Sequence, residues 1–174
     1  KEVKPNYILN SCGITIRRGA SSNLKATKKI NTELPNLIHR WSLKNKSKLI
    51  HFSTDCVFSG DKGNYNDFDI CDATDNYGSS KGKGELNSKS TLTLRSSMIG
   101  REIYNKTELL EWVIHNRNKK IKGFDNAIYS GVTTLWMSNI LIEIIEKYPR
   151  LYGIYNISSR PISKFDLITK INYY

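Results

Sequence analysis

The chain has 174 residues and a mass of 20.0 kDa, and 39% of its residues are hydrophobic, which is enough for one sizeable core. No apolar run approaches the roughly 18 residues of a membrane span, and residues 1–5 lack the apolar core of a signal peptide. We therefore expect a cytoplasmic protein without a membrane partner.

The net charge of +11 raises the question of nucleic acid, because basic surfaces attract phosphates of any sequence. The basic residues are scattered, however, and their densest cluster has no interleaved aromatic side chains for base stacking. That cluster consists of Arg117, Lys119, Lys120 and Lys122. We expect no nucleic-acid partner.

The cysteines and histidines do not have the spacing of a metal site. The chain has three of each, and no pair of cysteines stands in a Cys-x-x-Cys arrangement. They are Cys12, Cys56, Cys71, His39, His51 and His115. The sequence predicts reduced thiols and no bound metal.

Apolar runs of strand length alternate with segments of helical period, the pattern of βα units around a parallel sheet. Strands are predicted at 7–12, 48–52, 91–95 and 153–157, and helices at 24–41, 109–113 and 135–148, with a last one after Ser163. Pro35 should kink or restart the first helix, and Ser163 with Asp166 forms a capping box for the last. One helical face is predicted for Leu24, Ile30, Leu34, Leu37, Ile38 and Trp41.

Polar residues follow two of the predicted strands. Asn10 ends the first, and Ser53 and Thr54 follow the second. Tyr77 and Lys81 come next, one helical turn apart, so their side chains should share a helix face. A nearby ammonium lowers the pKa of a phenol, which can then donate a proton to a carbonyl oxygen during hydride transfer.

Context supports this pair, because about one Tyr-x-x-x-Lys is expected by chance in a chain of this composition. Thr54 could place a hydroxyl on the same carbonyl oxygen, or it could simply cap a turn beside Asp55. The connection 59–76 is long and acidic. Its position after a parallel strand is typical of ligand-binding loops, although solvation alone would also explain its charges.

These motifs resemble the extended short-chain dehydrogenase/reductases, and most closely the dTDP-4-dehydrorhamnose reductase family. The resemblance covers nearly the whole chain. It lies in Ser-Thr-Asp-Cys-Val-Phe-Ser-Gly at 53–60, Tyr-Gly-Ser-Ser-Lys at 77–81, Gly-Glu at 84–85, Leu-Arg-Ser-Ser-Met-Ile-Gly at 94–100, Ser-Gly-Val-Thr-Thr at 130–134 and Gly-Ile-Tyr-Asn-Ile-Ser at 153–158.

The resemblance implies a partial Rossmann-like, doubly wound parallel sheet of the α/β class, with part of a small C-terminal substrate-binding lobe. Residues 1–100 would form the C-terminal part of the NAD(P)-binding domain, and residues 101–174 the lobe mixed with late Rossmann elements. The implied catalytic residues are Thr54, Tyr77 and Lys81. The implied cofactor-binding residues are Asn10, Ser11, Cys12, Gly13, Ser53, Tyr77, Lys81, Ser97, Met98 and Ile99, and the implied substrate-binding residues are Val57, Phe58 and Arg101.

The chain departs from the family pattern at its front. The family begins with a strand and a glycine-rich turn that holds the pyrophosphate of the cofactor at a helix N-terminus, and no such motif occurs here. About 60 residues of two βαβ units are therefore expected to be missing. Gly82, which with Gly84 is expected inside the Tyr/Lys helix, should cost roughly 1 kcal/mol there, and Asp67 replaces a usual glutamate.

The expected function is reduction of the 4-keto group of a nucleotide-activated deoxysugar, with NADPH or NADH as cofactor. A homodimer is an expected option for its assembly. An alternative is a non-catalytic nucleotide-sugar-binding or regulatory relative, such as the regulatory subunit of methionine adenosyltransferase. A nucleotide-sugar epimerase or dehydratase is the third reading. No glutamate follows Asp55 as it commonly does in dehydratases, which makes this reading weaker.

Overall fold

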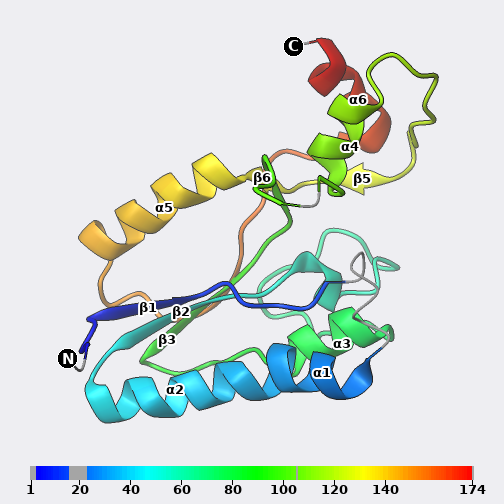
Figure 1. Ribbon diagram of the computed structural model, residues 1–174. Helices are drawn as coiled ribbons and strands as arrows, with labels where there is room; N and C mark the ends of the chain where they lie inside the picture. The colour runs from blue at the N-terminus through cyan, green and yellow to red at the C-terminus, as the bar shows by residue number, and fades with distance from the viewer. Residues whose placement is uncertain (1–2, 16–22, 105, 174) are drawn as a thin grey trace. The chain divides into compact units, whose positions relative to one another are not determined.

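The structure is a computed structural model that describes residues 3–15, 23–104 and 106–173 (Figure 1). It forms two compact units. The first comprises Lys1–Ser96 and Tyr148–Ile157, and the second Ser97–Lys147 and Ser158–Tyr174. The chain thus leaves the first unit and returns to it.

A four-stranded parallel sheet forms the centre of the first unit, in the order β1-β2-β3-β7. Its strands are β1 (Tyr7–Asn10), β2 (Lys48–Phe52), β3 (Thr91–Arg95) and β7 (Gly153–Asn156). The α/β class with a parallel sheet is confirmed. The two inner strands have the predicted bounds, whereas β1 ends at Asn10 and β7 at Asn156, short of the predicted 12 and 157.

The inner strands supply most of the core of this unit. Every residue of β3 is buried, and so are the middle residues of β2. Leu49, Ile50, Leu92 and Leu94 are 0–1% exposed. Strands buried on both faces read as nearly continuous apolar runs, which explains why these two were predicted without error.

One long helical segment runs along one face of the sheet (Figure 1). It consists of α1 (Leu24–Lys28), a π-helical turn (Lys29–Glu33) and α2 (Leu34–Asn45). Pro35 lies in the first turn of α2, where its missing N–H costs no helical hydrogen bond. The expected restart at this proline is confirmed, and the π turn precedes it.

The predicted apolar face of this segment is only partly buried, because Ile30, Leu34 and Ile38 are half-buried and the other three predicted residues are exposed. Leu24, Leu37 and Trp41 are exposed, by 60%, 56% and 38%. The buried residues are instead mostly small or polar: Thr27, Asn31, Pro35 and Ser42. A close approach explains the difference, since a Cβ on Gly84 would lie 2.0 Å from the carbonyl oxygen of Asn31.

The first unit also contains a 3₁₀ turn (Asp55–Val57) and α3 (Asn76–Gly82), which carries the Tyr/Lys pair. The helix was expected to include both Gly82 and Gly84. That expectation is wrong for Gly84, because α3 ends at Gly82 and the tight contact with Asn31 follows. Gly82 faces Cys71, whose Cβ would lie 3.2 Å from an added methyl group.

The second unit contains two small sheets and three helices among its described residues. Strands β4 (Met98–Ile99) and β6 (Val132–Thr133) pair in parallel, and β5 (Ile128–Tyr129) and β8 (Ile162–Ser163) pair antiparallel. The helices are α4 (Leu109–His115), α5 (Thr134–Lys147) and α6 (Lys164–Tyr173). Ser163 and Asp166 form the expected cap, with the Asp166 N–H bonded to the Ser163 hydroxyl at 3.0 Å.

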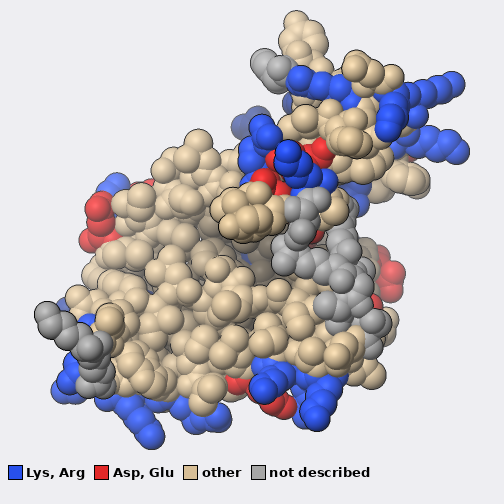
Figure 2. All heavy atoms as spheres, viewed as in Figure 1, with Lys and Arg blue, Asp and Glu red and all other residues tan. Residues whose placement is uncertain are grey.

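Basic side chains lie in several separate groups on the face shown in Figure 2, with uncharged surface between them. Among the described residues, no helix is both long and apolar enough to cross a bilayer. The same residues contain no group of three or more His, Cys, Asp or Glu side chains able to hold a metal ion.

Candidate active site

The carboxyl ends of β1 and β2 lie side by side, because Asn10 pairs with His51 in the parallel register. Asn10 is buried, and its amide oxygen accepts the N–H of Cys12 at 3.3 Å, so the NH₂ group faces Nδ1 of His51 at 3.1 Å. Burial and the positive charge of Lys81 lower the pKa of His51 to about 3. The histidine is therefore a neutral acceptor that fixes Asn10 at the strand end.

Thr54 follows β2 and caps the 3₁₀ turn. Its hydroxyl oxygen accepts the N–H of Cys56 at 3.1 Å and donates to the carboxylate of Asp55 at 3.2 Å. The capping role that the sequence left open is thus present. The side chain is 5% exposed, and these bonds hold its hydroxyl in one place at the carboxyl edge of the sheet.

Helix α3 begins against this turn. The carboxylate of Asp75 caps it by accepting the N–H groups of Tyr77 and Gly78, at 2.9 and 3.0 Å. A Cβ on Gly78 would lie 2.1 Å from the carbonyl oxygen of Cys56, so only glycine permits this approach. The close packing brings the start of α3, and with it the half-buried Tyr77, to the turn that Thr54 caps.

Lys81 lies one helical turn after Tyr77 and is 4% exposed. Its ammonium donates to the carbonyl oxygen of Phe52 at 2.6 Å, in the strand that leads to Thr54. Burial lowers its pKa to about 8, against the opposing effect of the negative charge of Glu85. The ammonium thus lies at the carboxyl end of β2, and its effect on the phenol of Tyr77 remains a prediction.

Sequence reasoning missed Asn31 in the π-helical turn. Its side chain is fully buried and bonds both the N–H and the C=O of Ile14, at 2.8 and 3.1 Å. It also donates to the hydroxyl of Ser80 at 3.0 Å. Asn31 therefore connects the segment after β1 to α3. The sequence signal for its inward position is its spacing, four residues from each of the buried Thr27 and Pro35 on one helix face.

The segment after β1 is mostly exposed at Ser11, Cys12 and Gly13. A Cβ on Gly13 would lie 4.0 Å from Nζ of Lys81, which places this segment along the lysine. The structure thus brings together the predicted residues of β1, β2 and α3. Cofactor contacts by Ser11, Cys12 and Gly13 remain a prediction.

The other predicted residues of the first unit differ in their burial and in their contacts. Ser53 is buried and donates to Glu85 at 2.6 Å. Val57 is fully buried, whereas Phe58 is partly exposed and stacks on Tyr65 with a centroid distance of 4.3 Å. Of the two apolar residues, Phe58 has more surface for a ligand.

Four predicted residues belong to the second unit. Ser97 accepts the N–H of Val132 at 3.0 Å, and Met98 and Ile99 form β4. Arg101 makes a 2.5 Å ion pair with the buried Glu111, while its own side chain is 71% exposed. Their roles toward cofactor and substrate remain predictions.

The family model described as the RmlD substrate binding domain matches residues 1–171. The chain belongs to this family. A dTDP-4-dehydrorhamnose reductase of Aggregatibacter actinomycetemcomitans is 28% identical over 184 residues, which cover 97% of this chain and 60% of the relative. The resemblance stated from the motifs is confirmed.

Solved structures of the same kind match the fold. A hypothetical dTDP-4-dehydrorhamnose reductase from Sulfolobus tokodaii superposes with a TM-score of 0.85 at 28% identity, covering 98% of this chain and 61% of that one. The Bacillus anthracis dTDP-4-dehydrorhamnose reductase, solved with NADP, gives 0.85 at 25%, covering 98% and 63%. This member of the RmlD family spans about 60% of the length of its relatives.

Proposed function

We propose that this chain forms the catalytic part of an NAD(P)H-dependent reductase that acts on the 4-keto group of a nucleotide-activated deoxysugar. The observation that carries the proposal is the buried ammonium of Lys81. It is bonded to the last residue of the strand that leads to Thr54, and it lies one turn from Tyr77. The family membership and the NADP bound to the Bacillus anthracis protein support the choice of reaction and cofactor.

Each residue has one role in the proposed reaction. Reduced nicotinamide, when bound, supplies a hydride to the carbonyl carbon. Tyr77 gives its phenolic proton to the carbonyl oxygen, so the ketone becomes an alcohol, and the ammonium of Lys81 favours the phenolate that remains. Thr54 exchanges its 3.2 Å bond to Asp55 for one to the same substrate oxygen, and donates its hydroxyl proton there as negative charge develops.

The described residues fit one end of the cofactor better than the other. The exposed segment at Gly13 lies beside Lys81, whose ammonium would also hold a ribose hydroxyl. No strand in the described part of the chain leads through a glycine-rich turn directly into a helix, the usual cradle of a pyrophosphate. We therefore propose contacts of the described residues only with the nicotinamide-ribose end.

The sugar and diphosphate are assigned to the remaining predicted residues. Phe58, which is partly exposed beside the buried Val57, would contact the deoxysugar methyl group. Contact of the diphosphate with Arg101, Lys119, Lys120 and Lys122 remains a prediction from the sequence. A cytoplasmic location, a homodimer and the absence of a nucleic-acid partner remain predictions from the sequence.

The test uses the complete gene product with NADPH or NADH and a dTDP- or UDP-linked 4-keto-6-deoxysugar. We expect loss of reduced nicotinamide absorbance and formation of the 4-hydroxy sugar, both abolished by Tyr77→Phe. Reduction of simple ketones but not of these sugars would refute the substrate class. Binding of sugar and cofactor without turnover would favour the regulatory alternative, and inversion or dehydration without net oxidation of the cofactor would favour the epimerase or dehydratase.

A further inference from the structure

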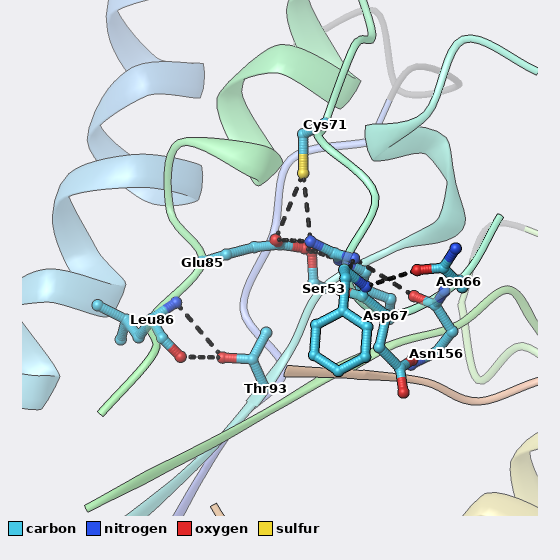
Figure 3. A network of polar contacts seen from close by, with 10 residues as sticks. Ser53, Asn66, Asp67, Cys71, Glu85, Leu86, Thr93 and Asn156 are labelled. Atoms are coloured by element: carbon cyan, nitrogen blue, oxygen red, sulfur yellow. Dashed lines mark hydrogen bonds and ion pairs between the residues drawn. The ribbon is translucent and has the colours of Figure 1, made fainter. Parts of the chain in front are cut away.

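A buried ion pair lies behind the candidate active site, within the first unit (Figure 3). The guanidinium of Arg95 makes two parallel bonds to the carboxylate of Glu85, at 2.8 and 2.7 Å, and both side chains are 5% exposed. Desolvation largely cancels the attraction in such a pair, so stability alone explains it poorly. The contacts on its two sides suggest another role.

One side of the pair contacts the catalytic strand. Ser53 donates from its hydroxyl to Glu85 at 2.6 Å, and the next residue along the chain is Thr54. Glu85 also lies four residues after Lys81, and its negative charge raises the lysine pKa against the effect of burial. Glu85 therefore bonds the residue before Thr54 and acts on Lys81 through its charge.

The other side of the pair holds the loop 59–72. Arg95 donates to the carbonyl oxygen of Asp67 at 3.2 Å, and its guanidinium lies 4.9 Å from the ring centre of Phe58. The carboxylate of Asp67 in turn accepts the N–H of Asn156 in β7 at 2.5 Å. The ring of Phe58, which stacks on that of Tyr65, is thus anchored to the sheet through Arg95.

We propose that Glu85 and Arg95 are a positioning pair, in which Glu85 orients Ser53–Thr54 and retains the charge of Lys81, while Arg95 holds the Phe58–Tyr65 wall for the sugar. The sugar part of this proposal rests on the proposed function. Neither residue touches the reacting atoms. Both act through the side chains that they hold.

The charges around Glu85 predict how its removal changes the protonation of Lys81. Arg95 from β3 bonds this carboxylate, the thiol of Cys71 donates to it at 3.5 Å, and its negative charge raises the pKa of Lys81 in α3. Burial and Glu85 raise the pKa of Cys71 to about 11, so the thiol stays neutral. Glu85→Gln leaves the two buried cations without their shared counter-charge, and Lys81 loses its proton more easily.

The first experiment measures the titration of Lys81 by NMR of the lysine Cε–Nζ group in the complete gene product. The signal is assigned by its absence in Lys81→Met. We expect the midpoint in Glu85→Gln to fall by at least about half a pH unit, with a smaller change in Glu85→Asp, which keeps the charge. Glu33→Gln, which removes an exposed partner of Lys28, is the control and should leave the midpoint unchanged.

The second experiment examines Arg95→Lys, which keeps the charge but loses the two-pronged bond. We expect KM for the nucleotide sugar to rise about tenfold, with KM for the cofactor and kcat within about threefold. Amide hydrogen exchange at Ser59, Asn66 and Asn156 should accelerate, since their N–H groups bond carboxylates in and beside the loop.

The outcomes separate this proposal from the proposed function. An unchanged Lys81 midpoint in a folded Glu85→Gln variant overturns the role of Glu85. Unchanged exchange in Arg95→Lys, or equal losses for sugar and cofactor, overturns the role of Arg95. If the wild-type protein reduces no nucleotide sugar, the proposed function fails, while the NMR and exchange results still decide whether the pair positions lysine and loop.

Discussion

The ammonium of Lys81 bonds the carbonyl oxygen of Phe52 at 2.6 Å, across 29 residues of sequence. This bond joins α3 to the last residue of β2, so the helix with the Tyr/Lys pair has a fixed position relative to the strand that leads to Thr54. It also holds the charge of Lys81 inside the first unit, where burial acts on it. Both the position of the Tyr/Lys pair and the pKa of Lys81 therefore depend on this contact.

Tyr77→Phe should lower ketone reduction by about a hundredfold or more, because it removes the proton donor but keeps the ring. The measurement is kcat/KM of the complete gene product with a 4-keto nucleotide sugar. Cofactor binding by calorimetry should be preserved. Tyr152→Phe, at an exposed tyrosine outside the candidate site, is the control. Wild-type turnover by Tyr77→Phe would remove Tyr77 from the mechanism.

Lys81→Met should change how stability depends on alkaline pH. The folded protein holds the pKa of Lys81 near 8, below its usual 10.5, so the unfolded chain binds more protons between these values. As the pH rises from 8 to 10.5, the free energy of unfolding of the wild type should therefore increase relative to that of Lys81→Met, by up to roughly 3 kcal/mol. Urea unfolding across this range gives the difference, and parallel curves for the two proteins would contradict the burial of a charged lysine.

His51→Gln should make the protein more resistant to acid. The folded pKa of His51 is about 3, so the folded histidine stays neutral while the unfolded one takes up a proton below its usual 6.5. Between pH 7 and pH 4 the free energy of unfolding of the wild type should fall by about 3 kcal/mol more than that of the variant. Urea unfolding at both pH values tests this difference. The control is His115→Gln, which replaces an exposed histidine of the second unit.

Two glycines two residues apart, Gly82 and Gly84, should respond differently to alanine. A Cβ on Gly84 would lie 2.0 Å from a backbone oxygen of Asn31, so Gly84→Ala must displace the helix and should cost at least about 2 kcal/mol. Gly82→Ala meets only the side chain of Cys71 at 3.2 Å, and helix propensity offsets that contact by roughly 1 kcal/mol. Thermal unfolding of both variants gives the comparison, and equal losses would refute the close approach.

A protein made of these 174 residues alone should bind NADPH or NADH weakly or not at all. Within its described residues, the sheet ends at β1, whose far edge has no strand partner, and no strand–turn–helix cradle for a pyrophosphate is present. Calorimetry should give no saturation at micromolar cofactor, and light scattering should show aggregation. Tight binding to a monodisperse sample would contradict this expectation.

The strands could be predicted from the sequence because their burial leaves a direct trace. Leu49, Ile50, Leu92 and Leu94 are apolar and lie in the core, as simple patterning assumes. The helical face could not be predicted in the same way. At Asn31 the helix is packed too closely for a large side chain, so polar and small residues lie inside, and the apolar Leu37 remains exposed.

The candidate site divides along similar lines. Tyr77, Lys81 and Thr54 were predicted because local spacing and the end of a strand define them. Glu85 and Arg95 lie ten residues apart in separate elements, and only the fold shows that their charges meet. Long-range polar contacts of this kind depend on tertiary structure, which neither periodicity nor a short motif encodes.

The path of the chain determines when the first unit can be completed on the ribosome. Strand β7 pairs with β3 and supplies Asn156 to Arg95 and Asp67, yet it is synthesised after residues 97–147 of the second unit. Until it emerges, the outer edge of β3 has no partner, and the loop 59–72 is held by Arg95 without the second anchor from Asn156. A chain released early would therefore contain Thr54, Tyr77 and Lys81 in full and still have an unfinished binding wall.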